Sequence, residues 1–418
     1  MLRLSRIKKG RIIMYPGIHN FSEIGKLNKV LLHRPGRELE KLTPNNFERL
    51  LFDDIPYLKV AQDEHDRFAQ VLKENGVEVC YYQQETAKAL ADIEIRRNFV
   101  NEFVNMTKDF SESIREAVVE FLMAKEPEDL VATCIAGVFS DEIKASAGSL
   151  FDIVKSEDVF ALDPMPNLYF TRDPGACVGN GINIHHMSTP ARRRESLLLE
   201  YMTKYNRDFA LEDTPMWYEI GGKYSIEGGD VLVLSKEIVA IGFSQRTTLA
   251  GIECFAENLL KNSEFKKVLV FDIPKCRAFM HLDTVFTMVD YDKFTIHPEI
   301  EGPLGVYEIT LGADGQLKYN AMMDELANIL ALELKLPAVD LIRCGGGDLI
   351  AAQREQWNDG SNTLCIAPGT VVTYERNYVT NDLLDKRGIK VLSIPSAELS
   401  RGRGGPRCMS CPVNRDDL

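Results

Sequence analysis

The chain has 418 residues, of which 45% are hydrophobic and 27% are charged, so it contains ample apolar material for a large core and one inserted subdomain. Its formal net charge of −13 argues against nucleic acid and anionic membranes as partners, because those surfaces favour clustered Lys and Arg. No stretch approaches the roughly 18 uninterrupted apolar residues of a membrane span. A small cationic substrate is compatible with the acid excess.

The nine cysteines are scattered along the chain, and only the last two, Cys408 and Cys411, lie close together. Their odd number and wide spacing are typical of a protein in the reducing cytoplasm. Residues 1–13 are basic and lack the apolar run of a signal peptide. We therefore expect a cytoplasmic protein in which residues 1–13 form a tail upstream of an alternative start at Met14.

The first predicted elements are a strand, a helix and a second strand, at residues 27–32, 59–75 and 77–81. The sequence then becomes helical, with apolar residues at three- and four-residue spacing. Helices are predicted here at residues 93–106, 111–124 and 140–154. This pattern predicts an inserted α-helical domain at residues 84–157, with a structural role, within a catalytic α/β part made of residues 14–83 and 158–418.

A repeat becomes visible when acidic and glycine-rich segments of the second half are aligned. Its landmarks, spaced about 50 to 65 residues apart, are Asp173, Asp230, Asp283 and Asp348. Two short apolar runs separated by a turn follow a landmark, and this order predicts a hairpin. The clearest predicted hairpins pair residues 231–234 with 238–241, and 349–352 with 363–366.

A helix and a strand precede the later landmarks. The predicted pairs are a helix at 247–262 with a strand at 267–271, a helix at 319–335 with a strand at 339–342, and a helix at 380–386 with a strand at 390–394. The last pair leads to the loop that holds Cys408, and the strand at 27–32 can supply the hairpin that this unit lacks.

The repeat therefore predicts an α/β fold that closes into a ring: a five-bladed pseudo-symmetric α/β propeller with an inserted helical bundle domain. With strands inside and helices outside, the five landmark loops would meet at one end of the axis and surround one small pocket. The alternative is an ordinary α/β sheet in which the landmarks are simple turns.

The landmark loops carry a cysteine, a histidine and several carboxylates. Cys408 follows a glycine-rich turn and offers a thiolate nucleophile, while His281 offers an imidazole for proton transfer. This set suits covalent attack on a positively charged carbon, and a guanidinium is the natural cation of that kind. Because a guanidinium is a cationic donor, its site needs acceptors, and Asp173 and Asp283 fit that role. Glu227 is expected to orient His281 and to favour its charged form.

Each of these assignments has a plainer alternative. An Asp beside glycine is commonly a turn former, and a single His is more often a satisfied hydrogen-bonding group than a catalyst. Cys408 and Cys411 form a C-x-x-C pair, which also suggests a redox pair or half of a zinc site. The second half of such a site is missing, since the adjacent His185 and His186 would point to opposite faces of a strand. We therefore expect Cys408 to react and Cys411 to pack.

Several segments together resemble the bacterial arginine deiminase family across residues 14–418. They are FSEIGKL at 21–27, LFDDIP at 51–56, NLYFTRD at 167–173, EGGD at 227–230, MHLD at 280–283 and GRGGPRC at 402–408. The resemblance implies the five-bladed propeller of guanidino-group-modifying enzymes, with an inserted helical domain and with no metal or cofactor. It also implies hydrolysis of L-arginine to L-citrulline and ammonia through an S-alkylthiouronium intermediate on Cys408, the first step of the arginine dihydrolase pathway.

The same resemblance implies that Arg192 and Arg246 bind the substrate α-carboxylate, that Asn167 and Arg403 make further contacts, and that the chain forms a homo-oligomer, either a dimer or a tetramer. Arg192 begins a run of three arginines, which can also be a solvated helix start. Where some relatives have a histidine before the nucleophile, this chain has Arg407. Two placements are open for Arg407: beside the thiol, where it would lower the cysteine pKa, or facing solvent.

Related reactions on the same scaffold are the main alternatives, namely those of agmatine deiminase, dimethylarginine hydrolase and amidinotransferases. Arg246 and the segment at residues 52–54 favour the free amino acid as substrate. A non-catalytic scaffold that binds protein partners is an alternative of another class. Residues 33–57, in which Asp53 and Asp54 lie among apolar residues, are expected to form a structural brace or a lid.

Overall fold

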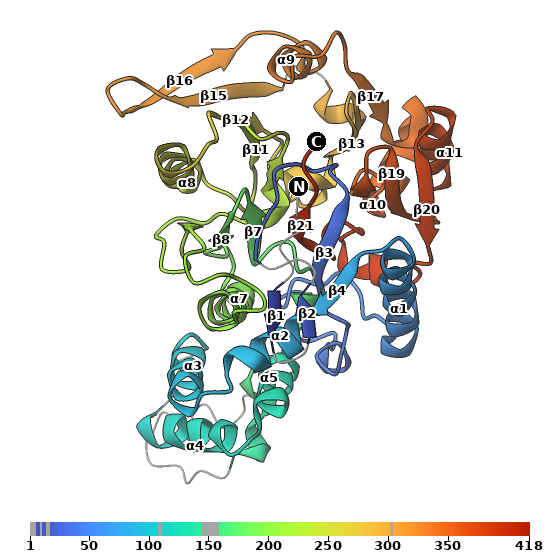
Figure 1. The fold of residues 1–418 in the computed structure, drawn as a ribbon. Helices are drawn as coiled ribbons and strands as arrows, with labels where there is room; N and C mark the ends of the chain where they lie inside the picture. The colour runs from blue at the N-terminus through green and yellow to red at the C-terminus, as the bar shows by residue number, and fades with distance from the viewer. Residues whose placement is uncertain (1–5, 9–10, 14–16, 108–110, 144–158, 302–303) are drawn as a thin grey trace.

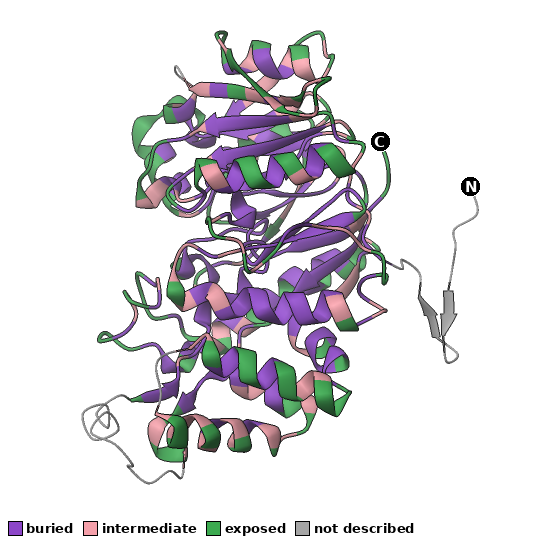
Figure 2. Ribbon diagram, turned by 90° about the vertical axis from the view of Figure 1, so that its left-hand side faces the viewer, coloured by how far each residue is buried: buried purple, intermediate pink, exposed green. Residues whose placement is uncertain are grey.

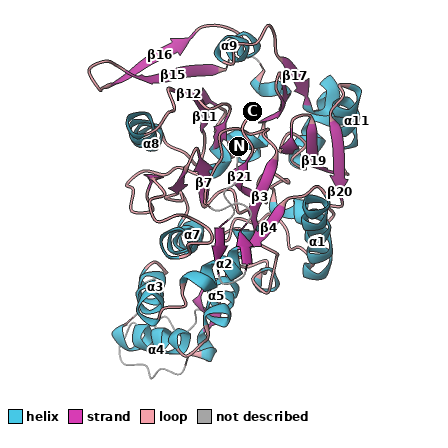
Figure 3. Ribbon diagram, viewed as in Figure 1, coloured by secondary structure: helices cyan, strands magenta, loops and turns pink. Residues whose placement is uncertain are grey.

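The structure is a computed structural model that describes residues 6–8, 11–13, 17–107, 111–143, 159–301 and 304–418. It is a mixed α/β protein in which most helices lie at the periphery and most strands lie nearer the centre (Figure 1, Figure 3). Two short strands of the predicted tail, β1 (Arg6–Lys8) and β2 (Arg11–Ile13), pair as a hairpin.

Five sheets share one plan, in which a middle strand pairs antiparallel with one neighbour and parallel with the other. Written with the middle strand second, they are β7 (Gly175–Val178), β8 (Gly181–Ile184), β9 (Met216–Tyr218); β10 (Val231–Val233), β11 (Ile238–Phe243), β12 (Lys267–Asp272); β13 (Phe286–Asp290), β14 (Lys293–Ile296), β17 (Asp340–Arg343); β18 (Leu364–Ala367), β19 (Thr370–Tyr374), β20 (Lys390–Ile394); and β21 (Cys411–Arg415), β3 (Leu27–Leu32), β4 (Glu78–Tyr81). The predicted order of hairpin, helix and strand is therefore present in the structure.

Helices make the crossovers that the parallel pairs require. They are α1 (Leu58–Glu74), α7 (Arg193–Tyr205), α8 (Leu249–Asn262), α9 (Leu326–Glu333) and α11 (Tyr378–Lys386). Helix α8 begins where the Thr248 hydroxyl accepts a hydrogen bond from the backbone N–H of Gly251 at 3.2 Å. Its apolar residues bury one face against the sheets and leave the other face to solvent, a pattern that Figure 2 shows for several helices.

The last strand of the described chain and the strand at 27–32 lie in one sheet. Strand β21 pairs antiparallel with β3, placing Cys411 opposite Leu31 and Arg415 opposite Leu27. The strand at 27–32 was predicted to complete the unit that holds Cys408, and this pairing confirms it. The pattern of residues 411–415 did not predict β21, because Pro412 and Asn414 are poor strand formers.

One predicted hairpin strand is wrong. Residues 349–352 begin helix α10 (Leu349–Trp357), and the hairpin of that sheet is formed by β18 and β19. Asp348 caps α10, since its carboxylate accepts a hydrogen bond from the backbone N–H of Ala351 at 2.7 Å. The residues after the cap are mostly good helix formers, and this local preference overrides the short apolar run.

One predicted helix is too long. Of residues 319–335, the first part belongs to β16 (Leu317–Met322), which pairs with β15 (Gly305–Leu311), and β15 in turn pairs with β12. Helix α9 occupies only the second part, where Leu326, Ile329 and Leu330 are buried. The added hairpin extends one sheet outward (Figure 1), and none of its residues lines the cavity described below.

Residues 82–136 form four helices, α2 (Tyr82–Ala89), α3 (Ile93–Asn105), α4 (Glu112–Met123) and α5 (Pro127–Ala136), followed by β5 (Val138–Phe139), which pairs with β6 (Phe160–Leu162). Two of the three predicted helices match α3 and α4; the third, at 140–154, lies mostly outside the described residues. The helices share their apolar core with α7, where the rings of Phe99 and Tyr201 lie 5.1 Å apart. No helix within the described ranges has the length and apolar character needed to cross a membrane.

Candidate active site

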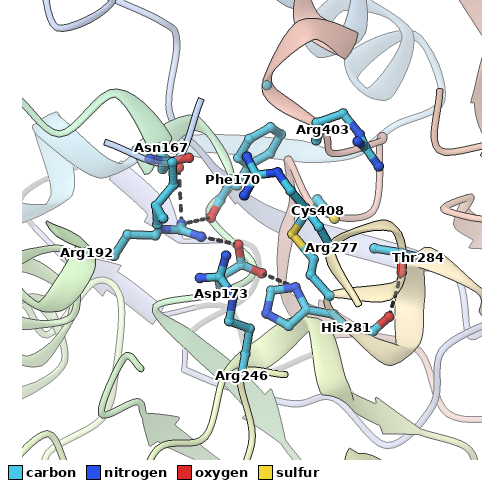
Figure 4. A pocket seen from close by; sticks show the side chains of 13 residues that line it. Asn167, Phe170, Asp173, Arg192, Arg246, Arg277, His281, Thr284, Arg403 and Cys408 are labelled. Carbon is cyan, nitrogen blue, oxygen red and sulfur yellow. Dashed lines mark hydrogen bonds and ion pairs between the residues drawn. The ribbon is translucent and has the colours of Figure 1, made fainter. Parts of the chain in front are cut away.

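A buried cavity of about 20 Å³ lies where loops from several sheets meet (Figure 4). Most of the predicted site residues line it: Asn167, Asp173, Arg192, Arg246, His281, Arg403 and Cys408. Residues that the sequence did not single out complete the wall: Leu51, Phe170, Arg277, Met280, Thr284 and Gly402. Glu227 and Asp283, which were also predicted, contact residues of this wall, so the structure brings the whole predicted set together.

Two of the landmark aspartates have purely structural contacts. One carboxylate oxygen of Asp230 accepts a hydrogen bond from the backbone N–H of Leu282 at 2.8 Å, and the other accepts from the Ser244 hydroxyl at 2.6 Å. Asp230 therefore fixes the loop that carries His281. Asp348 caps helix α10, is exposed and lies outside the cavity, so the prediction that every landmark loop surrounds one pocket is wrong for this loop.

Asp173 and Asp283 have a different arrangement, in which one oxygen is paired and the other is not. Arg192 Nη1 donates to Asp173 Oδ2 at 2.5 Å, and Arg407 Nη1 donates to Asp283 Oδ2 at 2.8 Å. The second oxygen of each carboxylate is buried and accepts no hydrogen bond from the described residues. Burial raises the pKa of Asp283, although the charge of Arg407 opposes this effect. Buried oxygens without partners are uncommon and indicate acceptors for a ligand.

His281 is held between carboxylates. Its Nε2 lies 2.8 Å from Glu227 Oε2, and its Nδ1 lies 3.7 Å from Asp173 Oδ1, which accepts no hydrogen bond but forms an ion pair with the protonated ring. Burial opposes protonation, but the charges of Asp173 and Glu227 outweigh it and raise the pKa of His281 to about 9. The other Glu227 oxygen accepts from the backbone N–H and the hydroxyl of Ser188, both at 2.9 Å. The imidazole is therefore charged at neutral pH and fixed in orientation.

Close packing against neighbouring groups requires the two glycines of the segment at 227–230. A Cβ at Gly229 would lie 2.6 Å from the ring atoms of His281, closer than side chains approach one another. A Cβ at Gly228 would lie 2.0 Å from the carbonyl oxygen of Arg172. The two glycines thus let this loop pass close to the imidazole and to the loop that carries Asp173.

Cys408 lies in the turn that precedes β21. Its backbone N–H donates to Asn362 Oδ1 at 3.0 Å, and its Sγ lies 3.6 Å from Asp283 Oδ2. Burial raises the pKa of Cys408 well above its usual value, and the negative charges of Asp283 and Asp173 raise it further. The thiol is therefore favoured over the thiolate at neutral pH.

Arg407 takes neither of the placements considered from sequence. Its side chain is buried, and it donates to Glu23 at 3.0 and 3.2 Å, to Asp283 at 2.8 Å and to the carbonyl of Val231 at 2.8 Å. It neither faces solvent nor lowers the pKa of Cys408, which is raised. Its role is to neutralise two buried carboxylates and to orient one of them beside the thiol.

The three predicted arginines differ in how much hydrogen-bonding capacity remains. Arg192 is buried, so it is not a solvated helix start, and all its nitrogens already donate to Asp173, to Glu195 or to backbone carbonyls. The guanidinium of Arg246 has no hydrogen bond within the described part of the chain. Arg403 has a left-handed backbone, with φ of 64°, and its Nε and Nη1 are buried without hydrogen-bond partners among the residues described.

The segment at residues 33–57 contributes both a wall and a brace. Leu51 lines the cavity with φ of 66°, a conformation that strains a residue of its size. Asp53 pairs with Arg277 at 2.8 Å, and Asp54 pairs with Arg401. Asn167 donates from Nδ2 to the carbonyl of Leu50 at 2.7 Å. These contacts join the segment to three other loops of the site.

The two thiols of the C-x-x-C pair lie in different environments. Cys408 lines the cavity, whereas Cys411 lies in β21 with its Sγ 3.7 Å from the carbonyl of Gly175 and hydrogen-bonded to the thiol of Cys177. Of the wall residues that sequence reasoning missed, Phe170 and Met280 belong to segments it had singled out. Leu51 and Gly402 do as well, whereas Arg277 and Thr284 lie in no motif, and only their position in the fold reveals them.

Known proteins resemble the chain at two levels. The family model described as arginine deiminase matches residues 48–415. An arginine deiminase of Clostridium perfringens is 53% identical over 404 residues, which cover 95% of this chain and 98% of that protein. One of Streptococcus pyogenes is 52% identical over 406 residues, covering 96% and 98%.

A solved amidinotransferase structure from Microseira wollei matches with a TM-score of 0.52 at 15% identity, covering 96% of this chain and 98% of that one. At this identity the likeness concerns the fold alone. The mixed α/β architecture is therefore one that amidinotransferases share.

Proposed function

The chain belongs to the arginine deiminase family, and on that premise we propose that it hydrolyses L-arginine to L-citrulline and ammonia with Cys408 as nucleophile. The observation that carries this proposal is the pair of buried carboxylate oxygens, one each on Asp173 and Asp283, that accept no hydrogen bond from the described residues. Both belong to residues that surround the Cys408 thiol.

These two oxygens suit a guanidinium. A substrate guanidinium has five N–H donors in one plane, so it can satisfy both free oxygens while its central carbon faces the sulfur. Arg192 and Arg407 hold the opposite oxygens of the two carboxylates and keep them from turning away. Binding in this way fixes the carbon and the nucleophile in reacting geometry before the reaction begins.

The substrate also activates the thiol. Burial and neighbouring negative charges favour the thiol of Cys408 over its thiolate. A guanidinium bound between the carboxylates brings a positive charge close to the sulfur, which lowers the cysteine pKa and favours the thiolate. Nucleophile formation is thus coupled to the presence of a cationic substrate.

His281 can act in both halves of the reaction. As an imidazolium, which its pKa of about 9 favours, it protonates the departing amine when the tetrahedral adduct collapses to the S-alkylthiouronium. The neutral imidazole then takes a proton from the water that attacks this intermediate. Collapse of the second adduct releases citrulline and returns the thiolate, and Glu227 and Asp173 hold the ring and stabilise its charge throughout.

Recognition of the amino-acid end is assigned to Arg246 and Arg403, with Asn167 as a further contact. Both arginines line the cavity with unused donors, as a carboxylate requires. Arg192 retains a single free N–H on Nη1, so its contribution to the substrate carboxylate is smaller than its contribution to Asp173. Agmatine lacks the carboxylate and is therefore disfavoured.

We also propose the finer architecture: a five-bladed α/β propeller made of residues 14–83 and 158–418, with residues 84–157 as an inserted helical domain and residues 1–13 as a tail. The common plan of five sheets and the pairing of β21 with β3 support a closed ring. A homo-oligomer, dimer or tetramer, is proposed as well, and light scattering during size-exclusion chromatography would measure it.

The first experiment is intact-protein mass spectrometry after rapid quenching during turnover of L-arginine, with peptide mapping and an assay for citrulline and ammonia. An amidino-alkyl adduct on the Cys408 peptide, absent in Cys408→Ala, is expected. Cys411→Ala serves as the matched control and should keep both the adduct and the activity. Citrulline release by Cys408→Ala would contradict the nucleophile assignment, and no citrulline from the wild type would contradict the activity.

A further inference from the structure

The chain has two tryptophans, and their environments differ. Trp217 is buried and donates from Nε1 to the carbonyl of Val178 at 2.8 Å. Trp357, at the end of helix α10, is 50% exposed and belongs to none of the apolar clusters that the described residues form. A large ring that packs in no core and remains half in solvent needs another reason for its position.

The contact that Trp357 does make is with Arg403. The guanidinium carbon of Arg403 lies 3.4 Å from the centroid of the Trp357 ring, which is close stacking of a cation on an aromatic face. Arg403 has few other restraints, since its ion pair with Asp53 is long, at 3.9 Å, and two of its buried nitrogens have no hydrogen-bond partner within the described ranges. The ring is therefore the closest support of this guanidinium.

Arg403 lies between two pockets. It lines the catalytic cavity, and it also lines an outer pocket of about 620 Å³ whose wall includes Trp357. Its backbone has a left-handed conformation, which residues other than glycine rarely adopt. A long, flexible side chain at such a boundary can turn to either pocket unless something holds it.

The turn after Trp357 also places an acidic residue, Asp359, near the guanidinium of Arg403. Asp359 is buried, has a left-handed φ of 59°, and keeps one carboxylate oxygen without a partner among the described residues. Burial raises the pKa of Asp359 to about 7, and the ionised form attracts the guanidinium of Arg403. The end of α10 thus offers Arg403 an aromatic face and a carboxylate, two groups suited to restraining a cation.

We propose that Trp357 is a positioning residue for substrate binding: its ring holds the Arg403 guanidinium so that the free donors of Arg403 face the amino-acid end of the substrate. This inference rests on the proposed function, because it concerns the affinity for L-arginine. Trp357 touches neither the reacting carbon nor the sulfur, so it acts on binding and leaves the chemical step unchanged.

Steady-state kinetics of citrulline formation test the proposal. Trp357→Ala should raise KM for L-arginine roughly three- to tenfold and leave kcat within about twofold. Trp357→Phe keeps an aromatic face and should restore most of the affinity. Leu349→Ala, which removes an exposed side chain of the same helix, is the matched control and should change neither constant. An unchanged KM in Trp357→Ala, or an equal change in Leu349→Ala, would overturn the proposal.

Tryptophan emission tests the contact without relying on turnover. Because Trp217 is buried elsewhere, Arg403→Ala should change the emission of Trp357 in the substrate-free protein, and the same substitution in a Trp357→Phe background should have no effect. No emission change would refute the stacking contact. If the emission changes but the wild type forms no citrulline, the proposed function fails while the contact stands. If citrulline forms and Trp357→Ala binds arginine normally, the positioning role fails alone.

Discussion

Replacing Arg407 with Met should destabilise the protein severely, because it leaves two carboxylates buried without their partner. Arg407 is 1% exposed and donates four hydrogen bonds, two of them to Glu23 and one to Asp283. Removing one partner of a buried ion pair costs about 3–5 kcal/mol. The pKa of Glu23 is consistent with a large effect: burial raises it, but Arg407, with smaller contributions from Arg172 and Arg415, lowers it overall from 4.5 to about 2, a net difference equivalent to about 3 kcal/mol.

Urea unfolding at pH 7, followed by fluorescence and circular dichroism, would measure the effect. Arg387→Met is the matched control, because Arg387 pairs with Asp340 at 2.8 Å, the distance of the Arg407–Asp283 pair, but both side chains are more than a third exposed. The control should lose less than about 1 kcal/mol. A loss below about 1 kcal/mol in Arg407→Met as well would refute the reasoning that burial makes this pair essential.

The same pair predicts a pH dependence with a definite sign. The pKa of Glu23 is lower in the folded protein than its usual value, so its contribution to stability is complete above pH 4.5 and is lost as the pH falls toward about 2. Arg407→Met removes that contribution at every pH. The difference in unfolding free energy between wild type and Arg407→Met should therefore narrow between pH 5 and pH 3, and a widening difference would contradict the assignment.

Three further substitutions test the site. His281→Ala should lower kcat about 100-fold or more, because it removes the proton donor and acceptor, and a normal rate of ammonia release would contradict this. Arg246→Ala should raise KM for L-arginine about tenfold or more but leave the inhibition constant of agmatine nearly unchanged, whereas equal losses would remove Arg246 from carboxylate binding. Gly229→Ala should displace the imidazole and lower kcat about tenfold or more, whereas Gly221→Ala, which has open space around it, should be active.

The sequence predicted most strands and helices because the spacing of apolar residues within a short segment reflects the secondary structure of that segment. The alternation of apolar runs and turns at residues 231–243 predicted β10 and β11, and the spacing of apolar residues predicted α8. The failures are also local in origin. Asp348 caps a helix where the apolar run at 349–352 suggested a strand. Pro412, a poor strand former, is the reason that β21 was not predicted.

Residue chemistry predicted the reactive set, but the sequence could not predict the contacts that tune it. Cys408, His281 and the carboxylates were chosen because a guanidinium needs a soft nucleophile, a proton carrier and acceptors. The raised pKa of Cys408 depends on burial and on charges from distant loops. Arg407 and Glu23 are 384 positions apart, and no spacing rule reports such a pair. Arg277 reaches the cavity in the same way, through the fold alone.

The landmark aspartates show what separates a substrate-binding carboxylate from a structural one. Asp173, Asp230 and Asp283 occupy similar places in the sequence repeat and are all buried. Both oxygens of Asp230 accept hydrogen bonds from neighbouring loops, so it has no capacity left for a ligand. Asp173 and Asp283 each give one oxygen to a buried arginine and keep the other free within the described chain. Each arginine thus holds one oxygen of its carboxylate, and the other oxygen is the one to which the proposed cationic substrate would bind.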